Sequence, residues 1–157
     1  GDAVTPAPVD AAFPTLLDTP PPVVRVYPKE TVVAEKLQAM VLLGMLNSRM
    51  KDFYDLAHLA RRSAFEGPLL VEAVRTTFDR RGTPLPAGIP VGLTEQVVED
   101  GGKRAQWAAF VGRSRLGETA SLSEVVAELR AFLVPVLSAA QKTRPLDQQW
   151  KPGGPWR

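Results

Sequence analysis

The chain has 157 residues, of which 45% are hydrophobic and 23% are charged, and its formal net charge is +2 at pH 7. These values are typical of one globular domain, with or without tails, and the net charge of +2 is only a weak indication of an anionic partner, since no long basic run accompanies it. The absence of cysteine excludes disulfides, thiolate zinc sites and a cysteine nucleophile, and the single histidine excludes a histidine-rich metal site.

Residues 1–27 are predicted to form an extended arm that ends in one short strand. Prolines are frequent over residues 1–22, and they bar regular structure. Residues 23–27 are β-branched and aromatic, which favours a strand, but no convincing partner strand follows downstream. The chain also starts at Gly1 without an initiating Met or a signal region, so we expect a piece of a longer protein, or a start left by cleavage.

Residues 27–60 predict two helices joined by the tight connection 44–48, which implies an antiparallel pair. Gly44 is expected to end the first helix as a left-handed cap, and Asn47 or Ser48 can cap the second. Apolar residues recur at helical spacing in the second helix, at Phe53, Leu56, Ala57 and Ala60.

Lys36 is the most informative residue of this helix pair. Its neighbours one turn away are largely apolar, and an unpaired ammonium is costly to bury there. Counting outward from the turn brings Lys36 level with Leu56, beside Asp55, and Asp52 lies three residues before Asp55 on the same side of the second helix. The three side chains are therefore expected to converge, either as functional groups or as a structural ion pair. Arg49 and Lys51 stand beside the carboxylates, where they could bind a phosphate or balance the acids.

The rest of the chain predicts further helices. One runs from Gly67 to about residue 80, with Leu69, Leu70, Val74 and Phe78 facing inward. Helical patterns resume at 93–98 and 103–113, and the capping-box sequence Ser121-Leu122-Ser123-Glu124 begins a long helix to about residue 141. Pro135 should kink or break that helix.

The predicted fold is mainly α: a bundle of about five helices over residues 28–141, preceded by the arm and its single strand. The tail over residues 142–157 contains Trp150 and Trp156, and it either docks on the body or is disordered. No apolar run reaches membrane-spanning length, so no membrane partner is expected.

Other candidate sites carry less weight. Gly101-Gly102-Lys103-Arg104 could bind an anion at a helix start, although a flexible linker is the simpler interpretation. His58 has no nucleophile or metal motif to serve, so a structural role is expected. Arg80 and Arg81 could touch a polyanion or simply end a helix.

Three segments around Lys36 carry a family resemblance. Y-P-K-E, A-E-K-L-Q-A and R-M-K-D-F-Y-D-L, at residues 27–30, 34–39 and 49–56, resemble the AbiEii/AbiGii nucleotidyltransferase toxins of type IV toxin–antitoxin and abortive-infection systems, and T-F-D-R-R-G-T-P-L-P at 77–86 is similar as well. The resemblance implies a bacterial, cytoplasmic enzyme with a polymerase-β-like sheet, in which a glycine-serine motif and paired aspartates hold Mg²⁺. The helical part would supply a lysine for the phosphates of a nucleoside triphosphate (NTP) and an aspartate that completes the site.

On this resemblance Lys36 is the lysine and either Asp52 or Asp55 is the aspartate. No glycine-serine motif with paired aspartates precedes Lys36, so we expect the C-terminal half of such a protein, without the metal ligands. Gly1-Asp2 resembles the end of the last strand of the sheet. This half is expected to be inactive by itself. The intact protein would transfer a nucleotide from NTP to an RNA or protein acceptor, with an antitoxin protein as a further partner. The alternative is a helical module that binds an antitoxin or another protein.

Overall fold

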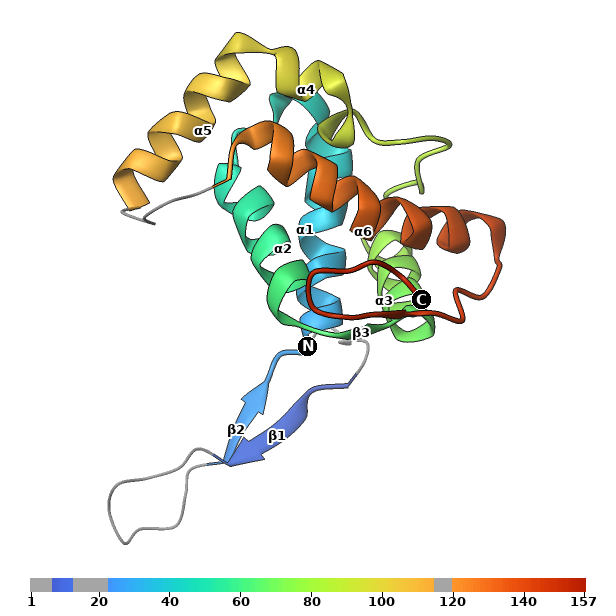
Figure 1. The fold of residues 1–157 in the computed structure, drawn as a ribbon. Helices are drawn as coiled ribbons and strands as arrows, with labels where there is room; N and C mark the ends of the chain where they lie inside the picture. The colour runs from blue at the N-terminus through green and yellow to red at the C-terminus, as the bar shows by residue number, and fades with distance from the viewer. Residues whose placement is uncertain (1–6, 13–22, 115–119) are drawn as a thin grey trace, which may run out of the picture.

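The computed structural model describes residues 7–12, 23–114 and 120–157, and within them the fold is mainly α, as predicted (Figure 1). The elements, in chain order, are β1 (Val9–Ala12), β2 (Val23–Val26), α1 (Lys29–Leu43), the 3₁₀ helix η1 (Gly44–Leu46), α2 (Met50–Arg62), β3 (Phe65–Glu66), α3 (Gly67–Arg80), the 3₁₀ helix η2 (Val91–Leu93), α4 (Glu95–Glu99), α5 (Gly101–Ser114), α6 (Leu122–Lys142) and β4 (Gln149–Trp150).

The predicted N-terminal strand does have a partner, which the sequence analysis missed. β2 pairs antiparallel with β1, so that Val9 lies opposite Val26 and Ala12 lies opposite Val23. The resulting hairpin projects from the helical body (Figure 1). β1 escaped prediction because only one of its four residues, Val9, is β-branched, and because its partner comes later in the chain. The expected likeness of Gly1-Asp2 to the end of a strand lies outside the described residues.

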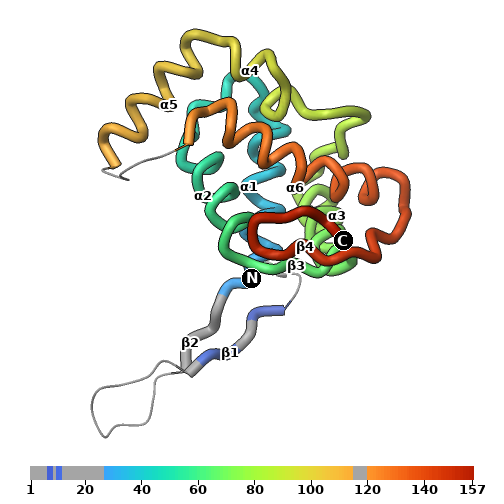
Figure 2. Tube along the Cα trace, viewed as in Figure 1, coloured from blue at the N-terminus to red at the C-terminus, as the bar shows by residue number. Residues whose placement is uncertain are grey.

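The helical core is built on α1, which packs more extensively against α3 than against α2. α6 lies across α2 and α3 and closes the other side of the core (Figures 1 and 2). The apolar face predicted for α2 is buried, and so are Leu70, Val74 and Phe78 of α3. Leu69 was expected to face inward, but it is 44% exposed, because Leu70 and Val71 occupy the core positions next to it.

The Gly101-Gly102 segment begins α5 and is not a flexible linker, so that interpretation was wrong. Asp100 caps this helix start, because its Oδ1 accepts a hydrogen bond of 2.8 Å from the Lys103 backbone N–H. The Lys103 side chain is buried, and its Nζ donates to the backbone carbonyl of Asn47 at 2.7 Å. α5 is therefore tied to the turn that precedes α2.

The capping box at the start of α6 is confirmed. The Glu124 backbone N–H donates to Ser121 Oγ, and the Ser121 backbone N–H donates to Glu124 Oε2. α6 continues without a break through Pro135 to Lys142.

The C-terminal tail docks on the body, which decides between the two alternatives left open for it. β4 pairs antiparallel with β3. Trp150 Nε1 donates to the Ala60 carbonyl at 2.7 Å, and Trp156 Nε1 donates to the Phe132 carbonyl at 2.9 Å. The two indole rings also pack against the ring of Phe132, so the tail completes the core.

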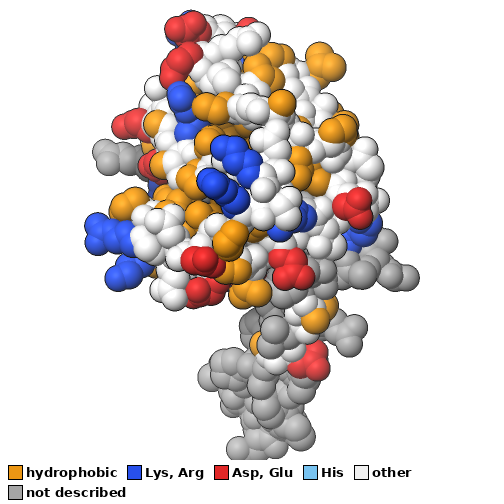
Figure 3. All heavy atoms as spheres, turned by 90° about the vertical axis from the view of Figure 1, so that its right-hand side faces the viewer, with side chains coloured by type: hydrophobic (Ala, Val, Ile, Leu, Met, Phe, Trp, Pro, Cys, Tyr) orange, Lys and Arg blue, Asp and Glu red, His pale blue; other side chains and the backbone are white. Residues whose placement is uncertain are grey.

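The exposed surface is mixed in character. On the face shown in Figure 3, the Lys and Arg side chains lie in separate groups among hydrophobic and acidic ones. No helix in the described ranges combines the length and the apolar character that crossing a bilayer requires.

Candidate functional site

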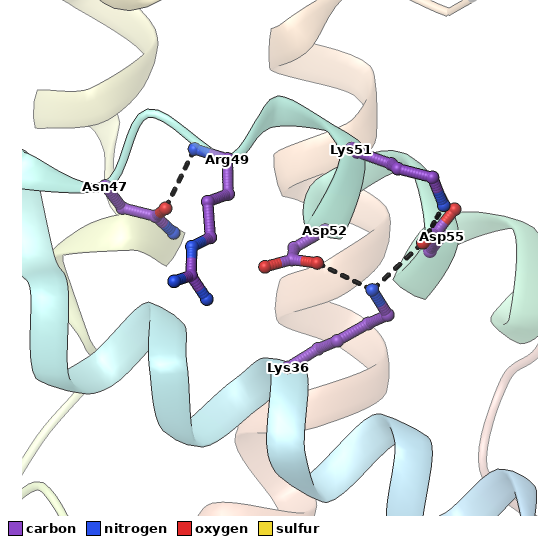
Figure 4. Close-up of polar contacts among 6 residues, drawn as sticks. All are labelled: Lys36, Asn47, Arg49, Lys51, Asp52 and Asp55. Carbon is purple, nitrogen blue, oxygen red and sulfur yellow. Dashed lines mark hydrogen bonds and ion pairs between the residues drawn. The ribbon is translucent and has the colours of Figure 1, made fainter.

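One ammonium group and two carboxylates meet between α1 and α2 (Figure 4). Lys36 Nζ lies 2.6 Å from Asp52 Oδ1 and 2.9 Å from Asp55 Oδ2. The buried apolar faces of α1 and α2 fix this register, because Leu37 and Leu56, next to these polar residues, are fully buried. The predicted convergence is present, and Lys36 contacts both aspartates.

The three side chains are mostly shielded from solvent, with exposed fractions of 21% for Lys36, 13% for Asp52 and 22% for Asp55. Burial alone would lower the pKa of Lys36, but the hydrogen bonds and negative charges of Asp52 and Asp55 outweigh burial, and the pKa lies above its ordinary value of 10.5. Burial alone would raise the pKa of Asp55, but hydrogen bonds from Lys51 and Lys36 hold it below 3.8. Lys36 and Asp55 are therefore both charged at neutral pH.

Lys51 and Arg49, the two other predicted phosphate-binding residues, differ in their surroundings. Lys51 Nζ lies 2.6 Å from Asp55 Oδ2 on the solvent side of α2, and its side chain is 72% exposed. Arg49 extends from the start of α2 toward α1 (Figure 4), and its guanidinium group forms no hydrogen bond or ion pair with the described residues. Among the residues that the structure describes, no carboxylate contacts the Arg49 guanidinium group.

The turn before α2 departs from the predicted capping. The helix begins after Arg49 without a side-chain cap, and Asn47 Oδ1 accepts from the Arg49 backbone N–H at 3.0 Å. Asn47 is buried, and its Nδ2 has no hydrogen-bond partner among the described residues. Gly44 has the expected positive φ of 50°, but its ψ of −129° lies outside the left-handed helical region.

Two hollows meet at this cluster. A polar depression of about 250 Å³ lies between α1 and the start of α2 and is lined by five charged residues: Glu35, Lys36, Arg49, Asp52 and Arg81. A larger hollow of about 670 Å³ lies between the start of α2 and α5. Arg49 and Asp52 line both hollows, so an occupant of either one would contact them.

Arg81 and Glu35 belong to this depression, and the sequence analysis did not connect them with it. Glu35 Oε1 accepts a hydrogen bond of 2.8 Å from the Tyr27 hydroxyl, and it lies 3.2 Å from Arg81 Nη2 and 3.5 Å from Arg80 Nη2. Glu35 directly precedes Lys36, and Arg81 lies in the T-F-D-R-R-G-T segment. Both residues therefore lie in segments that carry the family resemblance, but no local pattern joins one to the other.

The described residues do not fit a complete Mg²⁺ site. Magnesium requires several oxygen ligands in octahedral geometry. In the described part of the chain, no group of three or more His, Cys, Asp or Glu side chains is placed to hold a metal ion. Asp52 and Asp55 instead contact ammonium groups. The expectation of Mg²⁺ therefore stays a prediction.

His58 lies apart from this cluster. It is exposed on α2, and its ring stacks on Tyr54 with 6.0 Å between the ring centroids.

A comparison with known protein families places most of the chain in one of them. The family model described as "Nucleotidyl transferase AbiEii toxin, Type IV TA system" matches residues 1–138. No curated protein and no solved structure matches the chain.

Proposed function

The chain belongs to the AbiEii nucleotidyl transferase toxin family of type IV toxin–antitoxin systems, and from this membership we propose that Lys36, Asp52 and Asp55 handle the phosphates in a nucleotidyltransferase site. The reaction moves a nucleotide from NTP to a hydroxyl group of an RNA or protein acceptor. The observation that supports this role is the shielded ammonium of Lys36, held by two carboxylates at the edge of a polar depression.

In the proposed reaction the acceptor oxygen attacks the α-phosphorus of NTP in line with the leaving group. A bond forms between that oxygen and the α-phosphorus, the bond from the α-phosphorus to the bridging oxygen breaks, pyrophosphate leaves with the electron pair, and the hydroxyl proton is released. Negative charge builds up on phosphate oxygens during this step, so a positive charge fixed in place beforehand lowers the barrier.

Lys36 supplies this charge, because its raised pKa keeps it protonated throughout the neutral range. Asp52 and Asp55 hold the ammonium in one position, so little reorganisation is needed when the phosphates arrive. The cluster acts by electrostatics and positioning. We assign no step to Mg²⁺, because the described residues do not offer it a fitting set of ligands.

The test is transfer of label from radiolabelled NTP to RNA or protein by the complete gene product that carries this chain. We expect Lys36→Ala to reduce transfer by about 10²-fold or more, the usual cost of losing one group that stabilises transition-state charge. Arg130→Ala is the control, since Arg130 pairs with Glu95 on the surface and does not line the depression, and it should keep activity close to that of the wild type. Circular dichroism establishes that both variants are folded.

A second candidate is a helical module that binds an antitoxin or another protein. It is favoured by the exposure of Leu42 and Leu46, at 66% and 87%, where α1 ends and η1 follows. Full transfer by folded Lys36→Ala, together with loss of antitoxin co-purification by Leu46→Lys, would select this alternative over the catalytic role.

A further inference from the structure

We propose that Arg81 and Arg49 form the anion-binding end of the depression beside Lys36 and that they bind a polyphosphate chain. Glu35 holds Arg81 in place until the polyphosphate displaces the Glu35 carboxylate. This inference rests on the proposed function and names the residues that recognise the phosphates of the substrate.

Positive and negative charges are distributed unevenly around the depression. At the Lys36 end, one ammonium faces two carboxylates, those of Asp52 and Asp55, so its positive charge is already matched. At the opposite end, Glu35 is the carboxylate of the described residues that contacts Arg81, at 3.2 Å, and it also lies 3.5 Å from Arg80.

The guanidinium of Arg49 has no contacting carboxylate in the described part of the chain. The excess of positive charge therefore lies with Arg49 and Arg81, which line the same depression of about 250 Å³. That end therefore adds the unmatched positive charge that holds the outer phosphates of a polyphosphate chain, beside the phosphate that Lys36 contacts.

The Arg81 guanidinium group is held by a hydrogen bond to a buried residue, while part of the side chain stays accessible to solvent. Arg81 Nη1 donates to Gln38 Oε1 at 2.9 Å, and Gln38 Nε2 donates to Thr83 Oγ1 at 2.7 Å. Gln38 and Thr83 are buried, whereas the Arg81 side chain is 39% exposed. A guanidinium group held in this way presents its remaining N–H groups as a rigid fork, the geometry that suits phosphate oxygens.

Glu35 competes with a phosphate for Arg81. Its 3.2 Å separation from Arg81 is longer than the 2.6 Å between Lys36 and Asp52, so this ion pair is the looser of the two. Glu35 also accepts the Tyr27 hydroxyl hydrogen bond, which can keep the carboxylate in place after Arg81 turns to a ligand. A polyphosphate carries several negative charges, so it can displace a single carboxylate.

The test is isothermal titration of the complete gene product with inorganic triphosphate at low ionic strength. We expect Arg81→Ala to weaken binding about tenfold or more, and Arg81→Lys to weaken it by a smaller factor, because lysine keeps the charge but loses the fork. Glu35→Gln should tighten binding, because it removes the competitor. Arg130→Ala is the control: Arg130 pairs with Glu95 on the surface and does not line the depression, so binding should not change.

The direction of the Glu35→Gln effect separates phosphate binding from a purely structural role, since loss of a structural ion pair would not tighten triphosphate binding. If Arg81→Ala loses helical content, Arg81→Lys and Glu35→Gln decide the matter. Unchanged binding by folded Arg81→Ala, weaker binding by Glu35→Gln, or no triphosphate binding by the wild type would overturn the inference. The transfer assay on Lys36→Ala judges the proposed function separately, because it does not involve Arg81.

Discussion

Lys36→Met should measurably destabilise the protein, although methionine is an apolar residue of similar length placed on a largely apolar helix. The substitution removes the ammonium that lies within 3 Å of both Asp52 and Asp55. Asp52 then loses its ion-pair partner while Asp55 keeps only the exposed Lys51, and the two carboxylates remain close together. Their repulsion, more than the lost ion pair itself, sets the size of the effect.

The magnitude follows from Coulomb's law. Two carboxylates about 5 Å apart repel by about 3 kcal/mol at an effective dielectric constant of about 20. Asp52 and Asp55 are 13% and 22% exposed, so solvent screens part of this repulsion. The expected loss is therefore about 1–2 kcal/mol in the free energy of unfolding. Adding Asp52→Asn to Lys36→Met should recover much of the loss, because one of the two like charges is removed.

The assay is urea unfolding followed by far-UV circular dichroism at neutral pH. Lys51→Met is the control, because Lys51 bonds to the same Asp55 from an exposed position one turn away on α2; it should cost no more than about 0.5 kcal/mol. Equal costs for Lys36→Met and Lys51→Met, or a further loss on adding Asp52→Asn, would refute the reasoning.

Three further substitutions test other parts of the structure by the same unfolding assay. Asp55→Asn should cost about 1 kcal/mol of unfolding free energy at pH 7. The folded pKa of Asp55 lies below 3.8, so the stabilisation by its carboxylate is present above that value and is lost as pH falls through the folded pKa. A stability difference between wild type and Asp55→Asn that persists at low pH would contradict an ionic origin. Gly67→Ala should cost about 2–4 kcal/mol, since a Cβ there would lie 2.0 Å from the Leu146 carbonyl oxygen; a near-neutral effect would mean that the tail yields easily. Ser121→Ala should cost about 1 kcal/mol through loss of the capping box, and Ser123→Ala, two residues further on, should cost clearly less.

The sequence was a good guide where structure depends on local signals. The capping box at Ser121 and the apolar spacing of α2 and α3 predicted helices within a residue or two of those observed. The sequence failed where distant residues decide the outcome. β1 needs β2 to exist as a strand, and the start of α5 overrides the low helix propensity of two glycines through the Asp100 cap and the buried Lys103.

The residues of the candidate site also fall into those that local signals predicted and those that depend on distant packing. Counting along α1 and α2 from their shared turn was enough to bring Lys36 to Asp52 and Asp55, because that register depends only on helix geometry. The grouping of Arg81 with Glu35 depends on how α1 packs against α3, two helices separated in the sequence by α2. No local pattern specifies that packing, so only the structure could show that both halves line one depression.

The docked tail has a practical consequence for where the coding sequence is cut. A gene trimmed to residues 1–138, the stretch that the family model matches, would lose the last turn of α6, β4 and the indole rings of Trp150 and Trp156. Phe132 would then lose the two indole rings that pack against it, and Phe65 would lose its strand pairing with Trp150. A stable recombinant product therefore has to include residues 139–157, beyond the stretch that the family model matches. In the complete chain, a change in the fluorescence of Trp150 and Trp156 would report undocking of the tail from the helical body.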